Sequence, residues 1–196
     1  MLKRMRSYLI LVAFLLLTCS LVFAQKPLPK DAREPYKVDD EKTLLESARS
    51  LMIADKYAAL ITVDDDGIPR ARTVVTQLGT LDLTRPDKGL TVWILTRRST
   101  RKIEQIKKNP KVTLYYNDDA KESYVTLMGT ATIYTDPNNP EAKKFYTDEQ
   151  AKYFWPDLKK DFAMISVKPM WMEVLIWPTI KNHPDNWRPQ AVVFKY

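Results

Sequence analysis

The residues best suited to chemistry lie in one short segment, Thr96-Arg97-Arg98-Ser99-Thr100-Arg101-Lys102, where an expected strand gives way to an expected helix. The unpaired backbone N–H groups at a helix start, together with the macrodipole, attract an anion. Arginine side chains bind phosphate oxygens in a bidentate way. Because cations at this end oppose the helix dipole, the segment predicts an anion site. A solvated basic helix face is the alternative, since charge runs are often exposed.

A second pair of cations lies in the segment Arg70-Ala71-Arg72-Thr73-Val74-Val75-Thr76. The alternation of a strand puts Arg70, Arg72, Val74 and Thr76 on one face. A cationic pair on the inner face of a strand requires an anionic partner, so this strand is a second candidate for anion binding. For Arg70 we expect an exposed position at the edge of the sheet.

The composition narrows the kinds of site that the chain can build. It has 196 residues, 45% of them hydrophobic and 28% charged, which fits one domain and excludes a disordered tail. One Cys and one His exclude an internal disulfide and most zinc or iron sites, and we expect no metal. The four glycines are too far apart for a Gly-rich phosphate loop, so a bound phosphate would be held by side chains or a helix start.

The elements that must position these residues are mainly strands. Thr43 and Glu46 predict a capping box for a helix over 43–55. Seven or eight short strands with frequent turns favour a barrel, a mainly β fold with a few helices, over a doubly wound sheet. We expect further helices over 99–108 and 139–154, and strands over 58–63, 70–77, 90–96, 112–116, 124–134, 162–167, 170–177 and 190–194.

The first residues are typical of an export signal. Residues 1–24 combine a basic start, an apolar run and a Val-Phe-Ala ending, which predicts a secretory signal peptide and an exported, periplasmic or secreted protein without a stable membrane anchor. An uncleaved transmembrane anchor and lipidation at Cys19 are less favoured alternatives. Cleavage would remove three basic residues and no acids, lowering the net charge from +7 to +4. We expect residues 25–40 to be a linker and residues 41–196 the domain.

The order of motifs is more specific than any one of them. It runs through a D-D-D-G-x-P turn, R-T-V-V, W-x-L-T, S-T-R-K-x-x-Q-I-x-x-N-P and Y-V-T-L-x-G. This order resembles the FMN-binding split barrels related to pyridoxamine 5'-phosphate oxidase, with the nearest likeness to their bacterial general stress protein subgroup. The resemblance covers roughly residues 43–177 and implies a split β-barrel that binds FMN, with FAD possible, at the interface of a homodimer.

The resemblance also implies cofactor-binding residues. Arg72 would reach the flavin phosphate or ring edge, and the backbone of Thr73, Val74 and Val75 would lie along the isoalloxazine. Leu95 and Thr96 match the strand end at the phosphate. Thr100, Arg101 and Lys102 match the segment that grips the phosphate. Tyr124 stands near the place where the oxidase has a Gln beside the ring.

The expected function is an exported FMN-binding protein, an oxidoreductase for an unknown small substrate. A flavin-binding stress protein or carrier without turnover is the alternative, since no catalytic residue can be assigned. The C-terminal segment around His183 and Arg188 departs from the oxidase pattern, which argues against pyridoxamine phosphate as substrate. Export argues against nucleic acid as a partner. A haem-binding relative would need an axial ligand, and His183 is the single histidine.

Overall fold

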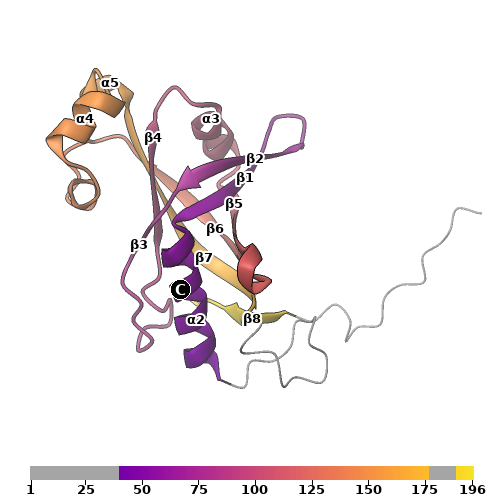
Figure 1. The fold of residues 1–196 in the computed structure, drawn as a ribbon. Coiled ribbons are helices and arrows are strands. Elements are labelled where there is room, and N and C mark those ends of the chain that lie inside the picture. Colours follow the sequence, from indigo (N-terminus) through magenta and orange to yellow (C-terminus); the bar gives the residue numbers. More distant parts are fainter. Residues whose placement is uncertain (1–39, 177–188) are drawn as a thin grey trace, which may run out of the picture. The chain divides into compact units, whose positions relative to one another are not determined.

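A computed structural model of the chain describes residues 40–176 and 189–196 (Figure 1). The predicted signal peptide, the predicted linker up to residue 39, His183 and Arg188 lie outside the described residues. Within those two ranges, none of the helices has the length and hydropathy needed to cross a membrane.

Helix α2 (Glu41–Asp55) opens the described domain. Its cap is Asp40, whose carboxylate accepts from the Thr43 backbone N–H at 3.0 Å and from the Thr43 hydroxyl at 2.6 Å. The predicted cap at Thr43 is therefore wrong by three residues, because a carboxylate one turn earlier takes those donors. The predicted apolar face is confirmed, since the buried residues of α2 are Leu44, Leu45, Ala48, Leu51 and Met52.

The domain is built on one eight-stranded sheet of order β2-β1-β5-β6-β7-β4-β3, with β8 added on β7 (Figure 1). All pairings are antiparallel. This confirms the mainly β prediction. The strands are β1 (Tyr57–Val63), β2 (Pro69–Val75), β3 (Gln77–Leu78), β4 (Val92–Arg97), β5 (Lys111–Asp118), β6 (Ser123–Tyr134), β7 (Phe162–Leu175) and β8 (Gln190–Val193).

Strand β7 is one long strand, although we expected two. Its partner β6 shifts register between Met128 and Gly129, so that Gly129 faces Pro169 while Met128 faces Trp171. This bulge allows β7 to continue through Pro169, which has no backbone N–H to donate to the regular hydrogen bonds of a β-sheet. Gly129 is needed there, because an added Cβ would lie 2.4 Å from the Lys168 carbonyl oxygen.

The β1–β2 hairpin has the predicted turn. The Asp64 carboxylate accepts from the backbone N–H groups of Asp66 at 3.1 Å and Ile68 at 2.9 Å. Gly67 adopts a positive φ of 77°, which glycine tolerates without strain. The hairpin register pairs Thr62 with Arg70 and Leu60 with Arg72.

Residues 135–161, which connect β6 to β7, form a small helical unit that we call the insert. It contains the 3₁₀ turn η3 (Ala142–Lys144), α4 (Asp148–Phe154) and α5 (Leu158–Asp161). The predicted single helix over 139–154 is wrong. Thr147 caps α4 in a reciprocal capping box with Gln150, which stops the helix from extending backwards. Tyr146, Trp155, Phe162 and Met164 are buried together in a separate aromatic cluster.

Helix α3 (Arg101–Lys108) follows β4 and begins two residues later than predicted. It buries Ile103 and Ile106. In Figure 1 it lies beside the β1–β2 hairpin, while α4 and α5 stand at the end of β4. The start of α3 is therefore flanked by the hairpin and by the end of β4.

Candidate functional site

The predicted anion site at the start of α3 has an open helix end. Thr100 occupies the N-cap position, but its side chain makes no cap hydrogen bond. Instead its hydroxyl donates to the Arg97 carbonyl oxygen at 2.9 Å. The first N–H groups of α3 therefore keep the capacity to donate to an anion.

Three cations gather at this helix start. The Lys102 ammonium donates to the Thr96 hydroxyl at 2.9 Å. Burial, and then the charge of Arg72, lower the pKa of Lys102. Burial, and then the charge of Arg101, lower the pKa of Arg72. Within the described residues no ion pair to an acid involves any of the three. Arg72, Arg101 and Lys102, which we call the cationic cluster, thus repel one another in the absence of an anion.

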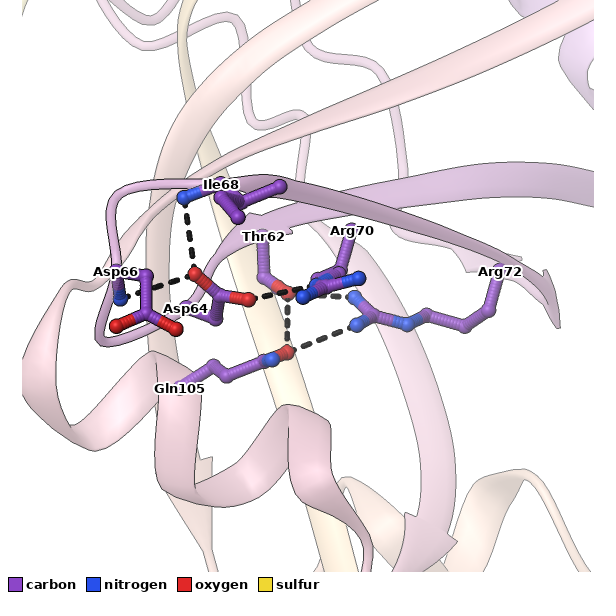
Figure 2. A network of polar contacts seen from close by, with 7 residues as sticks. All are labelled: Thr62, Asp64, Asp66, Ile68, Arg70, Arg72 and Gln105. Atoms are coloured by element: carbon purple, nitrogen blue, oxygen red, sulfur yellow. Dashed lines mark hydrogen bonds and ion pairs between the residues drawn. The ribbon is translucent and has the colours of Figure 1, made fainter.

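Arg72 is held in place by neutral groups. Figure 2 shows its guanidinium reaching two acceptors, the Thr62 hydroxyl at 2.6 Å and the Gln105 side-chain oxygen at 2.8 Å. The Thr62 hydroxyl also donates to the same Gln105 oxygen at 2.6 Å. Because Thr62 is fully buried in β1 and Gln105 lies on α3, this network fixes Arg72 between the hairpin and the helix.

Arg97 and Arg98, the first two cations of the predicted anion segment, have other partners. Arg97 Nε donates to the Phe154 carbonyl oxygen at 2.8 Å. Arg98 Nη2 donates to the carbonyl oxygens of Thr135 at 2.9 Å and Lys159 at 3.1 Å. These two arginines therefore fasten the insert to the end of β4, which leaves Arg101 and Lys102 as the candidates from this segment for the predicted anion site.

A cleft of about 410 Å³ opens beside this site. One of its walls contains Val75, Leu95, Thr96 and Thr100, four of the predicted cofactor-binding residues, which the fold brings together from β2, β4 and the loop before α3. Gln77 and Arg97 complete this wall.

The opposite wall of the cleft comes from the insert, through Phe145, Tyr146, Gln150, Phe154 and Trp155. The Trp155 indole N–H donates to the Thr96 carbonyl oxygen at 2.8 Å, which joins the two walls. Trp155 is also a core residue, 4% exposed in the aromatic cluster. Its place at the cleft depends on a contact with β4 that leaves no local pattern.

The remaining predicted residues lie elsewhere. Thr73 is exposed on β2, and Val74 is buried beneath it. Tyr124 lies near the opposite end of β6 from the cleft: it pairs with Leu175, whereas Tyr134 pairs with Met164 next to the partner of Thr96. Tyr124 is not among the described residues that line the cleft.

Tyr124 has its own polar partner. Its hydroxyl donates to the Glu173 carboxylate at 2.8 Å, and its ring lies against that of Tyr115 with centroids 5.7 Å apart. Burial, and then Glu173, raise the pKa of Tyr124, which keeps the phenol neutral at physiological pH.

A second hollow, of about 380 Å³, lies between the hairpin turn and α3. Two ion pairs lie in its lining, Arg70 with Asp64 at 2.6 Å and Lys108 with Asp65 at 2.5 Å, and the lining also contains Asp66, Glu104 and Arg101 of the cationic cluster. Within the described residues no group of three or more His, Cys, Asp or Glu side chains could hold a metal ion. This hollow therefore adjoins the cationic cluster: Arg70 and Lys108 are paired in it, whereas Arg101 has no ion pair within the described residues.

Comparison with known proteins decides the family. The family model described as pyridoxamine 5'-phosphate oxidase matches residues 44–175, about two thirds of the chain. The chain belongs to the pyridoxamine 5'-phosphate oxidase family. The match contains the cationic cluster and most of the cleft, so the site described above is part of the family domain. No curated protein matches this chain.

Solved structures of this family's fold agree. A Clostridium acetobutylicum protein related to general stress protein 26 of Bacillus subtilis is 25% identical, with a TM-score of 0.57 over 80% of this chain and 96% of that one. A pyridoxamine 5'-phosphate oxidase-related, FMN-binding protein from Nostoc punctiforme is 15% identical, with a TM-score of 0.55. The match covers 82% of this chain and 100% of that one. A haem-binding protein from Mycobacterium smegmatis is 18% identical, with a TM-score of 0.54. The match covers 76% of this chain and 57% of that one. The split-barrel prediction is confirmed.

Proposed function

We propose that this member of the pyridoxamine 5'-phosphate oxidase family binds FMN, with its phosphate at the start of α3. The observation that carries the proposal is the cationic cluster, which has no acidic partner among the described residues and lies at an uncapped helix start. A phosphate dianion would remove the mutual repulsion of these cations and accept hydrogen bonds from the helix N–H groups. The FMN-binding relative from Nostoc punctiforme supports this choice of ligand.

Each side chain of the site has a role in holding the cofactor. Arg101 and Lys102 would contact the phosphate, and Arg72, fixed by Thr62 and Gln105, would complete the charge around it. The backbone of Thr73 to Val75 would lie along the isoalloxazine, consistent with Val75 at the cleft wall. A bound flavin accepts and donates electrons or hydride, and the protein supplies position and charge. FAD remains a second flavin that the same phosphate contacts would fit.

We further propose a homodimer through the outer face of the sheet. The register brings Ile61, Thr113, Met128, Trp171 and Val193 into one row across five strands. Met128 is 40% exposed and Val193 is 62% exposed, so this face is both apolar and open in one chain. A second copy would cover it, and the dimer is the arrangement in which Tyr124 could approach a flavin.

An oxidoreductase for a small substrate is the proposed activity, and a flavin carrier is the second candidate. Among the residues that the structure describes, the lining of the cleft offers no Asp, Glu, His, Lys or Cys that could act as an acid or a base. Catalysis would therefore rest on the flavin itself. Consumption of a reductant by the FMN-loaded protein separates the oxidoreductase from the carrier.

We also propose export, on the strength of the basic start and apolar run in residues 1–24. Nucleic acid is not a proposed partner, and no membrane anchor is proposed once the signal is removed. Comparing the mass of the mature protein from the periplasm with that of the full chain tests the cleavage after Ala24.

The decisive experiment is an absorbance spectrum and a mass of the ligand released from purified protein. We expect a flavin spectrum and the mass of FMN. Replacing Arg101 and Lys102 together with Ala should weaken FMN binding by about a hundredfold or more. The matched control replaces Lys107 and Lys108, which lie in the last turn of the same helix and pair with Glu104 and Asp65. Equal FMN affinity in both double variants would disprove the assignment of the phosphate site.

A further inference from the structure

The lining of the cleft includes five residues of the insert in addition to the residues that we assign to the cofactor. We propose that its insert wall is the substrate subsite of this protein, and that it takes an uncharged planar aromatic compound bearing a carbonyl oxygen. This inference rests on the proposed function, because the flavin-binding strand end forms the facing wall.

The location of the cleft suits a substrate of a bound flavin. Val75 lies in the wall of the cleft and in the segment whose backbone we propose lies along the isoalloxazine. Phe154 and Trp155 lie in the other wall, fastened to β4 by the Arg97 and Trp155 hydrogen bonds at 2.8 Å each. A ring held by the insert would therefore lie next to the cofactor segment.

The insert wall offers aromatic surface. Phe154 is 50% exposed although it is a large apolar side chain, and its ring contacts that of Trp155 with centroids 6.0 Å apart. Trp155 in turn contacts Tyr146 in an edge-on arrangement with centroids 5.4 Å apart. A half-exposed ring backed by buried rings at a cleft is a stacking surface for a planar ligand.

The charge of the lining disfavours an ionic substrate. Arg97 is the single cation among the described residues of the lining, and its Nε already donates to the Phe154 carbonyl oxygen. The cationic cluster lies at the phosphate end, where Lys102 is bonded to Thr96. A second phosphate or a carboxylate in the aromatic half would lose its water without gaining a comparable partner.

Two amide side chains are among the polar groups that line the cleft. Gln77 lines one wall and Gln150 the other. The Gln150 side-chain oxygen accepts from the Thr147 backbone N–H at 2.9 Å, which turns the amide so that its NH₂ group is left to donate. Because Gln150 lines the cleft and its oxygen is already bonded, its amide would favour a ligand that carries an acceptor such as a carbonyl oxygen.

The test uses FMN-loaded protein and three ring compounds. 1,4-Naphthoquinone is planar and uncharged, 2-naphthoate carries a carboxylate, and pyridoxal 5'-phosphate carries a phosphate. Binding is followed by changes in flavin absorbance and by calorimetry. We expect naphthoquinone to bind more tightly than either anion, and Phe154→Ala to weaken it roughly tenfold. The control is Tyr153→Ala, which removes the neighbouring ring on α4, 78% exposed and outside the lining.

The outcomes separate the two proposals. Tighter binding of naphthoate or pyridoxal 5'-phosphate would overturn the uncharged class. The subsite would be disproved if Phe154→Ala and Tyr153→Ala lost the same naphthoquinone affinity. It would also be disproved if naphthoquinone showed no saturable binding to FMN-loaded protein. Neither result would contradict FMN binding. If the protein takes up no FMN, quenching of tryptophan emission by naphthoquinone in the flavin-free protein, weakened by Phe154→Ala alone, would support the cleft while the flavin proposal fails. Unchanged FMN affinity in both variants shows that their fold is intact.

Discussion

Gln105 has an unusual task for a neutral side chain, because it stabilises one cation within a group of three. Its side-chain oxygen accepts from Arg72 and from the buried Thr62 hydroxyl. A carboxylate in its place would pair with Arg72 more strongly. The neutral amide instead leaves the charge of Arg72 available to an external anion. At the residue scale, the choice of amide over acid at position 105 is what preserves the anion site.

The variant Gln105→Glu tests this reading. The new carboxylate would neutralise Arg72 from inside and repel the phosphate, so FMN affinity should fall by about tenfold or more. The free energy of unfolding should stay the same or rise, since an ion pair replaces a neutral hydrogen bond. FMN titration and thermal unfolding measure the two effects. Wild-type FMN affinity in this variant would show that Arg72 does not act on the phosphate.

Lys102 gives the site a pH dependence. Burial and Arg72 lower its pKa below the ordinary 10.5, so the ammonium loses its proton earlier than an exposed lysine does. FMN affinity should therefore be complete below the lowered pKa and fall as the pH rises through it. Lys102→Arg keeps its charge over this range and should extend tight binding to higher pH. FMN titrations from roughly pH 7 to 10 compare the two proteins. Identical profiles would exclude Lys102 as a phosphate ligand.

At the scale of elements, the insert shapes the cleft. It is held at its base by Arg98, which reaches the carbonyl groups of Thr135 and Lys159, and at the cleft by Arg97 and Trp155. Within the insert, α4 is a short helix that depends on its capping box. Short helices gain little from propagation, so their caps contribute a large part of their stability.

Thr147→Ala should therefore unfold α4 more readily than it unfolds the sheet. The expected loss of helix stability is about 0.5–2 kcal/mol, the usual effect of removing a Thr cap. The cleft should lose naphthoquinone affinity, because the Gln150 backbone N–H loses the Thr147 hydroxyl and α4, which carries Gln150 and Phe154, becomes less ordered, while FMN affinity should change little. Hydrogen exchange of residues 148–154 and ligand titration check this. Faster exchange throughout the sheet would contradict the idea that α4 is a local unit.

At the scale of the whole molecule, the two faces of the sheet differ. Leu114 and Leu127 are fully buried in the core cluster that also contains residues of α2. The alternate positions Tyr115 and Met128 point the other way and are 36% and 40% exposed. An apolar sheet face left open in one chain favours self-association.

Met128→Lys should convert the proposed dimer to a monomer and weaken FMN binding. The lysine would lie in the middle of the apolar row, between Thr113 and Trp171. Sedimentation or light scattering measures the mass. Ile53→Lys is the control, since Ile53 is 51% exposed on α2, on the side of the sheet away from Met128. A monomeric wild-type protein, or an unchanged dimer in Met128→Lys, would disprove this interface.

Local patterns predicted much of this fold and part of the site. The strand alternation around Arg72 and the short segment from Ser99 to Lys102 were sufficient to indicate an anion site. They could not show that Arg97 and Arg98 bind carbonyl groups of the insert, because those contacts join distant parts of the chain. The long strand β7 was missed for a similar reason, since the bulge that accommodates Pro169 involves Gly129 on another strand.

The position of β4 in the sheet orders the events of folding. In the sheet, β4 lies between β3 and β7. Thr96 on β4 pairs with Ala163 on β7, which lies far along the sequence from the phosphate segment. We therefore expect Leu95 and the start of α3 to reach their final positions only after β7 pairs with β4. This pairing joins strands that are distant in the sequence, so it forms slowly. FMN should then bind only when the chain is almost completely folded. In stopped-flow refolding with FMN present, flavin quenching should follow the formation of the sheet, and FMN should slow unfolding without accelerating folding.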